Sequence, residues 1–309
     1  MKKIFIAFTA VVMTAVSVSA QDLAQATETF NNGAMELQME NKAAALANFQ
    51  SALQMATALG EQGAEIAANC KNTIPALVLS IAKDEIKASN FDAAVEKLNE
   101  AIAIAKEYEN ADVAGDAETL IPQVFMQKGN TALQAKDMAT AFAAYTKVVE
   151  LDPTNANAYL RLGRVLGATG KVEEAVAAYE KAAANGEETD AKKQISTLFV
   201  KKASAALKAK NYAAAIESAL KSNEYLENAN AMKIAGTASQ FLNKNADAIS
   251  FLEKYLELSP KAKDGNQMKY TIAALAQTAG DKAKAKEYYQ QIVTDPKFGA
   301  TALEMLKAL

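Results

Sequence analysis

The chain holds few of the side chains that usually carry catalytic chemistry. It has no His in 309 residues, so the commonest general base and metal ligand is absent. Cys70 is its only Cys, so neither a disulfide within the chain nor a Cys–His nucleophile pair can form. We interpret Cys70 as a small apolar residue on a helix face, with a disulfide to another chain as the alternative.

Paired carboxylates are the remaining acid–base candidates. Glu173-Glu174, and Glu187-Glu188 followed by Asp190, could in principle serve as a glycosidase-like pair. Both groups fall at expected turns and helix starts, where acids suit the helix dipole, so we predict that they are solvated. No Gly-rich loop followed by Lys-Ser or Lys-Thr occurs, so a nucleotide-binding motif is missing. The residues therefore favour a non-enzymatic protein with no cofactor and no metal.

Arg161 and Arg164 stand out because they are the only arginines of the chain and lie one helical turn apart. Their planar guanidinium groups suit a carboxylate or a phosphate. The surrounding segment, 156–189, reads as two short helices separated by Gly170-Lys171. The apolar faces have helical spacing and comprise Tyr159, Leu162, Gly163 and Leu166 in the first helix and Ala175, Tyr179 and Ala182 in the second.

Two helices can approach closely only where a small residue lies at their crossing. Gly163 and Ala175 meet that need, and Tyr179 is expected to fill the space beside them. A single pair cannot bury its apolar face alone, which predicts further copies. Seven copies align on a small residue, a residue four later and a third seven later: Ala45/Phe49/Ala52, Ala94/Leu98/Ala101, Ala141/Tyr145/Val148, Ala175/Tyr179/Ala182, Ala215/Ala219/Ser222, Ala248/Leu252/Tyr255 and Ala285/Tyr289/Ile292.

Two further positions recur in every copy. Twelve residues before the leading Ala stands a Gly or Ala in each case, as the crossing requires: Gly33, Ala82, Gly129, Gly163, Ala203, Gly236 and Ala273. Four residues before it, five of the seven copies have Asn or Asp, which favour turns and helix N-caps: Asn41, Asn90, Asp137, Asn211 and Asp281. The pattern resembles the tetratricopeptide repeat, a helix–turn–helix unit of 34 residues.

This resemblance implies an all-α, right-handed superhelical solenoid of about seven such pairs, one domain over residues 21–309, closed by a capping helix at 298–309. The first two spacings between leading alanines, 49 and 47 residues, exceed 34 and predict longer first helices. Pro75 and Pro122 either begin a helix or kink a longer one, and we favour the kinked long helix.

Residues 1–20 read as a secretory signal. Lys2 and Lys3 precede an apolar run over 4–16, and Val18-Ser19-Ala20 suits a cleavage site, so the mature chain is expected to start at Gln21. A membrane anchor is the alternative, but the run is short for a span of about 20 apolar residues. The signal predicts export, to the periplasm or outside the cell, with no membrane span left after cleavage.

By resemblance, the inner, groove-facing residues of each repeat lie 18, 15, 14, 11, 8 and 7 places before the leading Ala. None of these 42 positions (seven repeats of six) is Asp or Glu, although 36 acids in 309 residues would give about five. The polar residues that we select there as partner-binding candidates are Lys83, Lys87, Asn130, Asn157, Arg161, Arg164, Lys201, Lys208 and Lys233. The alternative to a functional basic groove is that the acidic residues simply occur on the second helix of each pair. This explains why the inner positions lack Asp and Glu, but not why both arginines lie there.

Some tetratricopeptide domains bind a free C-terminus with a clamp of Lys and Asn side chains. Asn130 and Arg161 match two positions of that pattern, whereas Met126 and Asn157 stand where Lys is expected. The clamp is therefore incomplete.

Composition limits the class of partner. The net charge is −3, or −5 for the mature chain (31 basic against 36 acidic residues), which argues against nucleic acid. We predict a scaffold that holds a protein or peptide, with acidic partners among the candidates, in a basic-lined groove. The alternative is a self-associating structural or assembly protein of the cell envelope.

Overall fold

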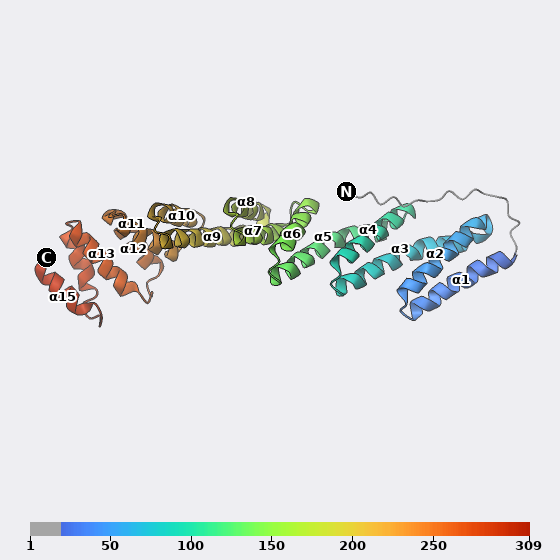
Figure 1. The fold of residues 1–309 in the computed structure, drawn as a ribbon, viewed down its shortest axis with the longest axis horizontal. Helices are drawn as coiled ribbons and strands as arrows, with labels where there is room; N and C mark the ends of the chain where they lie inside the picture. Colours follow the sequence, from blue (N-terminus) through green and yellow to red (C-terminus); the bar gives the residue numbers. More distant parts are fainter. Residues whose placement is uncertain (1–19) are drawn as a thin grey trace. The chain divides into compact units, whose positions relative to one another are not determined.

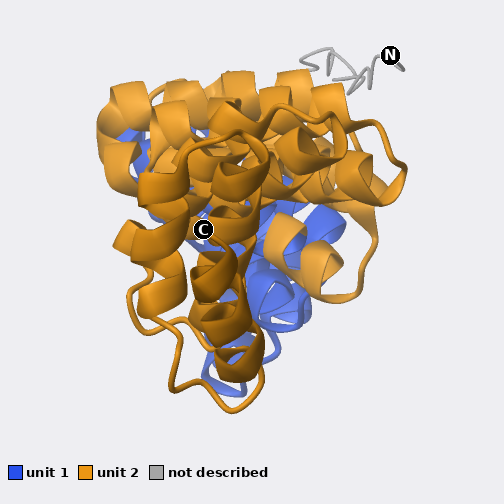
Figure 2. Cartoon of the chain, turned by 90° about the vertical axis from the view of Figure 1, so that its left-hand side faces the viewer, with its two compact units in different colours: residues 1–128 blue, residues 129–309 orange. Residues whose placement is uncertain are grey.

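The computed structural model describes residues 20–309, and this part of the chain is helical throughout, without β-strands. Within each unit, most consecutive helices are joined by short turns and pack against one another. Contacts divide the chain into two compact units, residues 1–128 and 129–309, which are coloured separately in Figure 2 and described separately below.

In the first unit, α1 packs on α2, α2 on α3 and α3 on α4 (Figure 1). A single 3-10 turn, Gly60–Gly63, separates α2 from α3. The helices are α1 (Ala20–Gln38), α2 (Lys42–Ala58), α3 (Ala64–Lys87), α4 (Phe91–Glu107) and α5 (Ala111–Gln134), the last of which crosses the boundary between the units.

In the second unit, each helix from α6 to α15 packs against the next (Figure 1). A wide helical turn at Ala183–Glu187 joins α8 to α9, with Gly186 at a φ of 107°. The helices are α6 (Met138–Leu151), α7 (Ala156–Ala168), α8 (Val172–Ala182), α9 (Glu188–Lys208), α10 (Tyr212–Tyr225), α11 (Ala229–Phe241), α12 (Asn245–Leu258), α13 (Gly265–Thr278), α14 (Lys282–Gln290) and α15 (Gly299–Ala308).

The aligned positions of the sequence repeat form the core. Every leading Ala has no exposed surface, and the residues four and seven places later are buried in each copy. The Gly or Ala twelve places earlier is buried as well. The alignment of the copies is thus confirmed by burial at these four positions.

Glycines occupy crossings that have no room for a side chain. A Cβ on Gly163 would lie 2.7 Å from Cε1 of Tyr179, and one on Gly129 would lie 2.6 Å from Cε1 of Tyr145. Real Cβ atoms do not approach this closely, so the aromatic ring of the second helix packs directly on the backbone of the first. The predicted role of Gly163 and of Tyr179 beside it is confirmed.

Most of the predicted turn residues cap the helix that follows. The side chains of four of the five accept a hydrogen bond from a backbone N–H in the first turn, at 3.0–3.4 Å: Asn41, Asp137, Asn211 and Asp281. Asn90 makes no such bond and instead donates to Glu85 at 2.8 Å.

The two internal prolines lie inside continuous helices. Pro75 is in α3 and Pro122 is in α5, each 24 residues long, so the prediction of long helices is confirmed over that of helix starts. Proline removes one backbone hydrogen bond. Around Pro75, the side chains of Ile74, Leu77 and Val78 are buried in the core. Their packing compensates for the missing hydrogen bond and keeps α3 continuous. The predicted capping helix is also present, as α15 packed on α14.

Three expectations stay predictions. The signal sequence falls on residues outside the described part, apart from Ala20, the first residue of α1. The single domain over 21–309 and the right-handed superhelix likewise stay predictions. Within residues 20–309, no helix combines the length and the apolar character needed to cross a membrane.

Candidate binding site

The predicted partner-binding residues lie on the first helices of successive pairs. Most are exposed, while Asn130 and Lys233 are half-buried. Lys83 and Lys87 are on α3, Asn130 on α5, Asn157, Arg161 and Arg164 on α7, Lys201 and Lys208 on α9, and Lys233 on α11. The two lysines of α3 belong to the first unit and the others to the second.

Three of these residues gather around the phenol of Tyr145. The Tyr145 hydroxyl donates a hydrogen bond to Oδ1 of Asn130 at 2.9 Å. Arg161 and Arg164 lie on α7, which packs against α6. Burial raises the pKa of Tyr145, and the positive charges of the two arginines oppose that rise. We call Asn130, Tyr145, Arg161 and Arg164 the arginine cluster.

The charges of the arginine cluster are not neutralised by the protein. Arg161 and Arg164 are exposed, and neither forms an ion pair with any residue that the structure describes. Burial raises the pKa of Tyr179 to about 12, so this second phenol near Arg164 stays neutral at physiological pH. Both arginines therefore face solvent with their charge unopposed.

Two of the predicted lysines are engaged within the fold. Lys87 pairs with Asp84 at 3.2 Å, and Asp84 also pairs with Lys42 of α2. Lys233 pairs with Asp264, the residue that precedes α13. Asp84 and Asp264 do not lie at the inner positions of the repeat. Their carboxylates nevertheless reach lysines that do.

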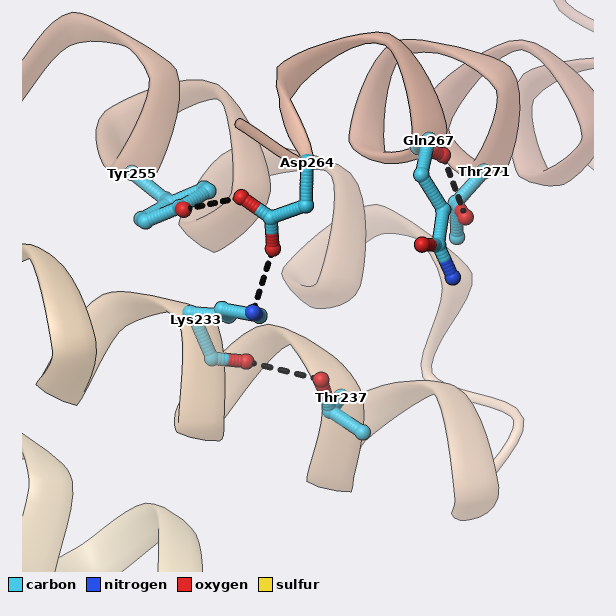
Figure 3. A network of polar contacts seen from close by, with 6 residues as sticks. All are labelled: Lys233, Thr237, Tyr255, Asp264, Gln267 and Thr271. Atoms are coloured by element: carbon cyan, nitrogen blue, oxygen red, sulfur yellow. Dashed lines mark hydrogen bonds and ion pairs between the residues drawn. The ribbon is translucent and has the colours of Figure 1, made fainter. Parts of the chain in front are cut away.

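The contacts of Asp264 tie three elements together (Figure 3). Its carboxylate pairs with Lys233 of α11 and accepts a hydrogen bond from the hydroxyl of Tyr255 of α12 at 2.5 Å. These two partners lower the pKa of Asp264, and burial with the nearby carboxylate raises the pKa of Tyr255 to about 12. Thr237 and Thr271 donate hydrogen bonds only to backbone carbonyls of their own helices. The links between repeats are therefore the two contacts of Asp264, and their role is structural.

This tie predicts a pH dependence of stability. A carboxyl whose pKa is lower in the folded state stabilises it above the unfolded-state pKa, about 3.9, and the stabilisation is lost as the pH falls through the lower, folded value. We expect Asp264→Asn to be less stable than the parent at pH 7 and the difference to shrink below about pH 4. Urea unfolding of both chains across pH 3–7 measures it. A difference that is constant over this range would contradict the prediction.

The thiol of Cys70 and the acidic side chains of residues 20–309 form no reactive or metal-binding site. Cys70 is buried, and burial raises its pKa to about 11, so the thiol is protonated at neutral pH. Over residues 20–309, no group of three acidic or Cys side chains could hold a metal ion. The repeat alignment predicts Tyr145 as a packing residue and assigns no role to its hydroxyl. The signal was its residue type, because a buried Tyr needs a partner for its polar end.

The family comparisons match two segments of the chain. Residues 132–193 and residues 270–297 each match a model described as tetratricopeptide repeat. These two segments are therefore similar in sequence to tetratricopeptide repeats. The first segment holds Tyr145, Arg161 and Arg164, so most of the arginine cluster lies within repeat sequence. No curated protein matches the chain.

Solved structures show distant likenesses. A crystal structure of the MamA protein is 19% identical, with 59% of this chain and 96% of that one covered and a TM-score of 0.38. YrrB, described as a TPR protein with an unusual peptide-binding site, is 21% identical, with 60% and 91% covered and a TM-score of 0.34. The C-terminal part of a TPR repeat-containing protein from Cytophaga hutchinsonii is 18% identical, with 73% and 98% covered and a TM-score of 0.39. At such low TM-scores, these likenesses say nothing about the binding site.

Proposed function

We propose that this protein is a non-enzymatic scaffold that holds a protein or peptide segment through the arginine cluster of its second unit. Repeats of this kind stack into rigid arrays, and a rigid surface loses little conformational entropy when a partner binds. The partner is expected to present a carboxylate, either of a side chain or of a chain end.

The observation that carries the proposal is the pair of unopposed arginines on α7. Four of the chain's predicted inner-face cations in the second unit, Arg161, Arg164, Lys201 and Lys208, are exposed and make no ion pair with the residues described. Lys233 differs, because Asp264 already neutralises it. Charge for a partner is thus concentrated on α7 and α9.

Asn130 and Tyr145 add a fixed polar edge beside the arginines. The Asn130 amide holds its Oδ1 towards the Tyr145 hydroxyl, and this leaves the amide N–H groups free to donate to an acceptor. Two guanidinium groups and an amide donor together suit a carboxylate better than a neutral ligand.

The test is a binding measurement with the double variant Arg161→Ala/Arg164→Ala. A partner is first isolated with the mature chain, and its affinity for both chains is measured at low salt and at 0.5 M NaCl. We expect the parent to lose affinity as salt rises, since exposed charges are screened over about 8 Å at physiological ionic strength. We expect the double variant to lose most of its binding at low salt while keeping its helical circular dichroism signal.

The matched control is Lys286→Ala/Lys307→Ala, which removes two exposed lysines from α14 and α15, distant in sequence from the arginine cluster. It alters the net charge equally and should bind like the parent. If both double variants lose affinity to the same extent, net charge rather than the arginine cluster attracts the partner, and the proposal is wrong.

A further inference from the structure

An exposed aromatic stack lies where two helix turns meet in the second unit. The ring of Phe241, the last residue of α11, lies nearly parallel to that of Tyr212, the first residue of α10, with centroids 4.7 Å apart and planes at 13°. Phe241 is 60% exposed although it is stacked, and the next residue, Leu242, is 38% exposed. We call Tyr212, Phe241 and Leu242 the aromatic platform.

The stack holds the Phe241 ring in place before any partner arrives. A free aromatic side chain would lose rotational freedom on binding, whereas a stacked ring has already lost most of it. An aromatic side chain exposed to this degree leaves apolar area in water, and such area in a fixed geometry is typical of contact sites.

The turns that carry the platform are basic. From Lys208 to Ala215 and from Phe241 to Ala248, the charged residues are three lysines, Lys208, Lys210 and Lys244, against one acid, Asp247, a local balance of +2. All three lysines are exposed, and none has an ion-pair partner in the described part of the chain. Stacking of Tyr212 on Phe241 brings the two turns together, so the three lysines lie on the turns that carry one apolar surface.

We propose that the aromatic platform is a second docking site, which takes a short peptide segment with an apolar or aromatic side chain flanked by acidic residues. The side chain packs on Phe241 and Leu242, and the acids lie against the lysines of the two turns. This site goes beyond the proposed function, because Tyr212, Phe241 and Leu242 are not part of the arginine cluster and can be occupied while that cluster is empty. Lys208 is the one exposed lysine of α9 that both sites could use.

The size of the platform favours a short segment over a second copy of the chain. A stable interface buries about 800 Å² on each partner. An aromatic side chain buries at most about 150–250 Å², and Tyr212 is already half-covered. Three side chains therefore suit a single anchor residue and its neighbours.

A displayed library of random 12-residue peptides tests the proposal with the full chain as bait. We expect the enriched peptides to share an aromatic or large apolar residue with at least two acids close to it. Synthetic copies of these peptides, labelled with fluorescein, then give affinities by fluorescence polarisation. Phe241→Ala should weaken binding about tenfold or more, as expected for a central aromatic anchor. Lys208→Gln/Lys244→Gln should weaken it severalfold at low salt and hardly at all at high salt.

The matched control is Leu303→Ala, which removes another exposed apolar side chain, on α15, and should leave the affinity unchanged. Arg161→Ala/Arg164→Ala should also leave these peptides bound, so failure of this proposal and failure of the arginine cluster are distinguishable. The proposal is overturned if no peptide is enriched, if enrichment survives Phe241→Ala, or if the enriched peptides lack acids. A dimer of the parent that Phe241→Ala dissociates would also overturn it, since the occupant would then be a second copy.

Discussion

Gly163→Leu is expected to destabilise the α7–α8 pair severely. A Cβ at this position would already lie 2.7–3.0 Å from three ring atoms of Tyr179, and Leu adds three further carbons. Tyr179 is buried, so its ring cannot swing away without displacing its neighbours. Overpacking costs typically about 1–3 kcal/mol and occasionally more, and a branched side chain against a buried ring belongs at the upper end of that range. Urea unfolding and hydrogen exchange of the α7 and α8 amides measure the effect.

Two further variants show that the crossing itself is responsible. Gly115→Leu places the same side chain on α5 at an exposed glycine with open space around it, and should not destabilise the protein. It should even raise stability by up to about 1 kcal/mol, because Leu is a better helix former than Gly. Gly163→Leu/Tyr179→Ala should be less destabilised than the sum of the two single changes, because removal of the ring makes room for Leu. Strict additivity would mean that Gly163 and Tyr179 do not share this space.

Local rules predicted the positions that pack. The requirement for a small residue at a helix crossing recurs at a fixed spacing, so Gly33, Gly129, Gly163 and Gly236 could be found from sequence alone. The same periodicity located the leading alanines, all of which are fully buried. Helix caps were predictable at Asn41 and Asp137 for a similar reason, because they act on the N–H groups of the next three residues.

Contacts made by loops and side-chain ends could not be predicted in this way. Asp264 lies in the longer connection between α12 and α13, whose path no repeat spacing defines, and it neutralises Lys233. Asp84 lies one residue from Lys83, yet it pairs with Lys87 and with Lys42 on another helix. The choice of partner depends on where long, flexible side chains can reach, which only the packed structure shows.

Tyr145→Ala is expected to be the most destabilising truncation on α6. The Tyr145 side chain is among the largest that are completely buried, and it packs on Gly129, which has no side chain to fill the space left behind. Truncation of a large buried aromatic residue costs about 3–5 kcal/mol, since it combines lost burial with a cavity. Phe142→Ala is the control on the same helix, because Phe142 is 38% exposed and its loss should cost about 1 kcal/mol or less.

Tyr145→Phe separates the ring of this residue from its hydroxyl. Phe keeps the packing on Gly129 and loses only the hydrogen bond to Asn130, which is worth about 1 kcal/mol. Asn130 is half-buried and can turn to water, so no unpaired polar group remains inside. We therefore expect near-parental urea unfolding for Tyr145→Phe and a loss several times larger for Tyr145→Ala. Equal losses would mean that the hydroxyl, and not the ring, holds α6 against α5, and the arginine cluster would then be part of the core rather than a surface that rests on it.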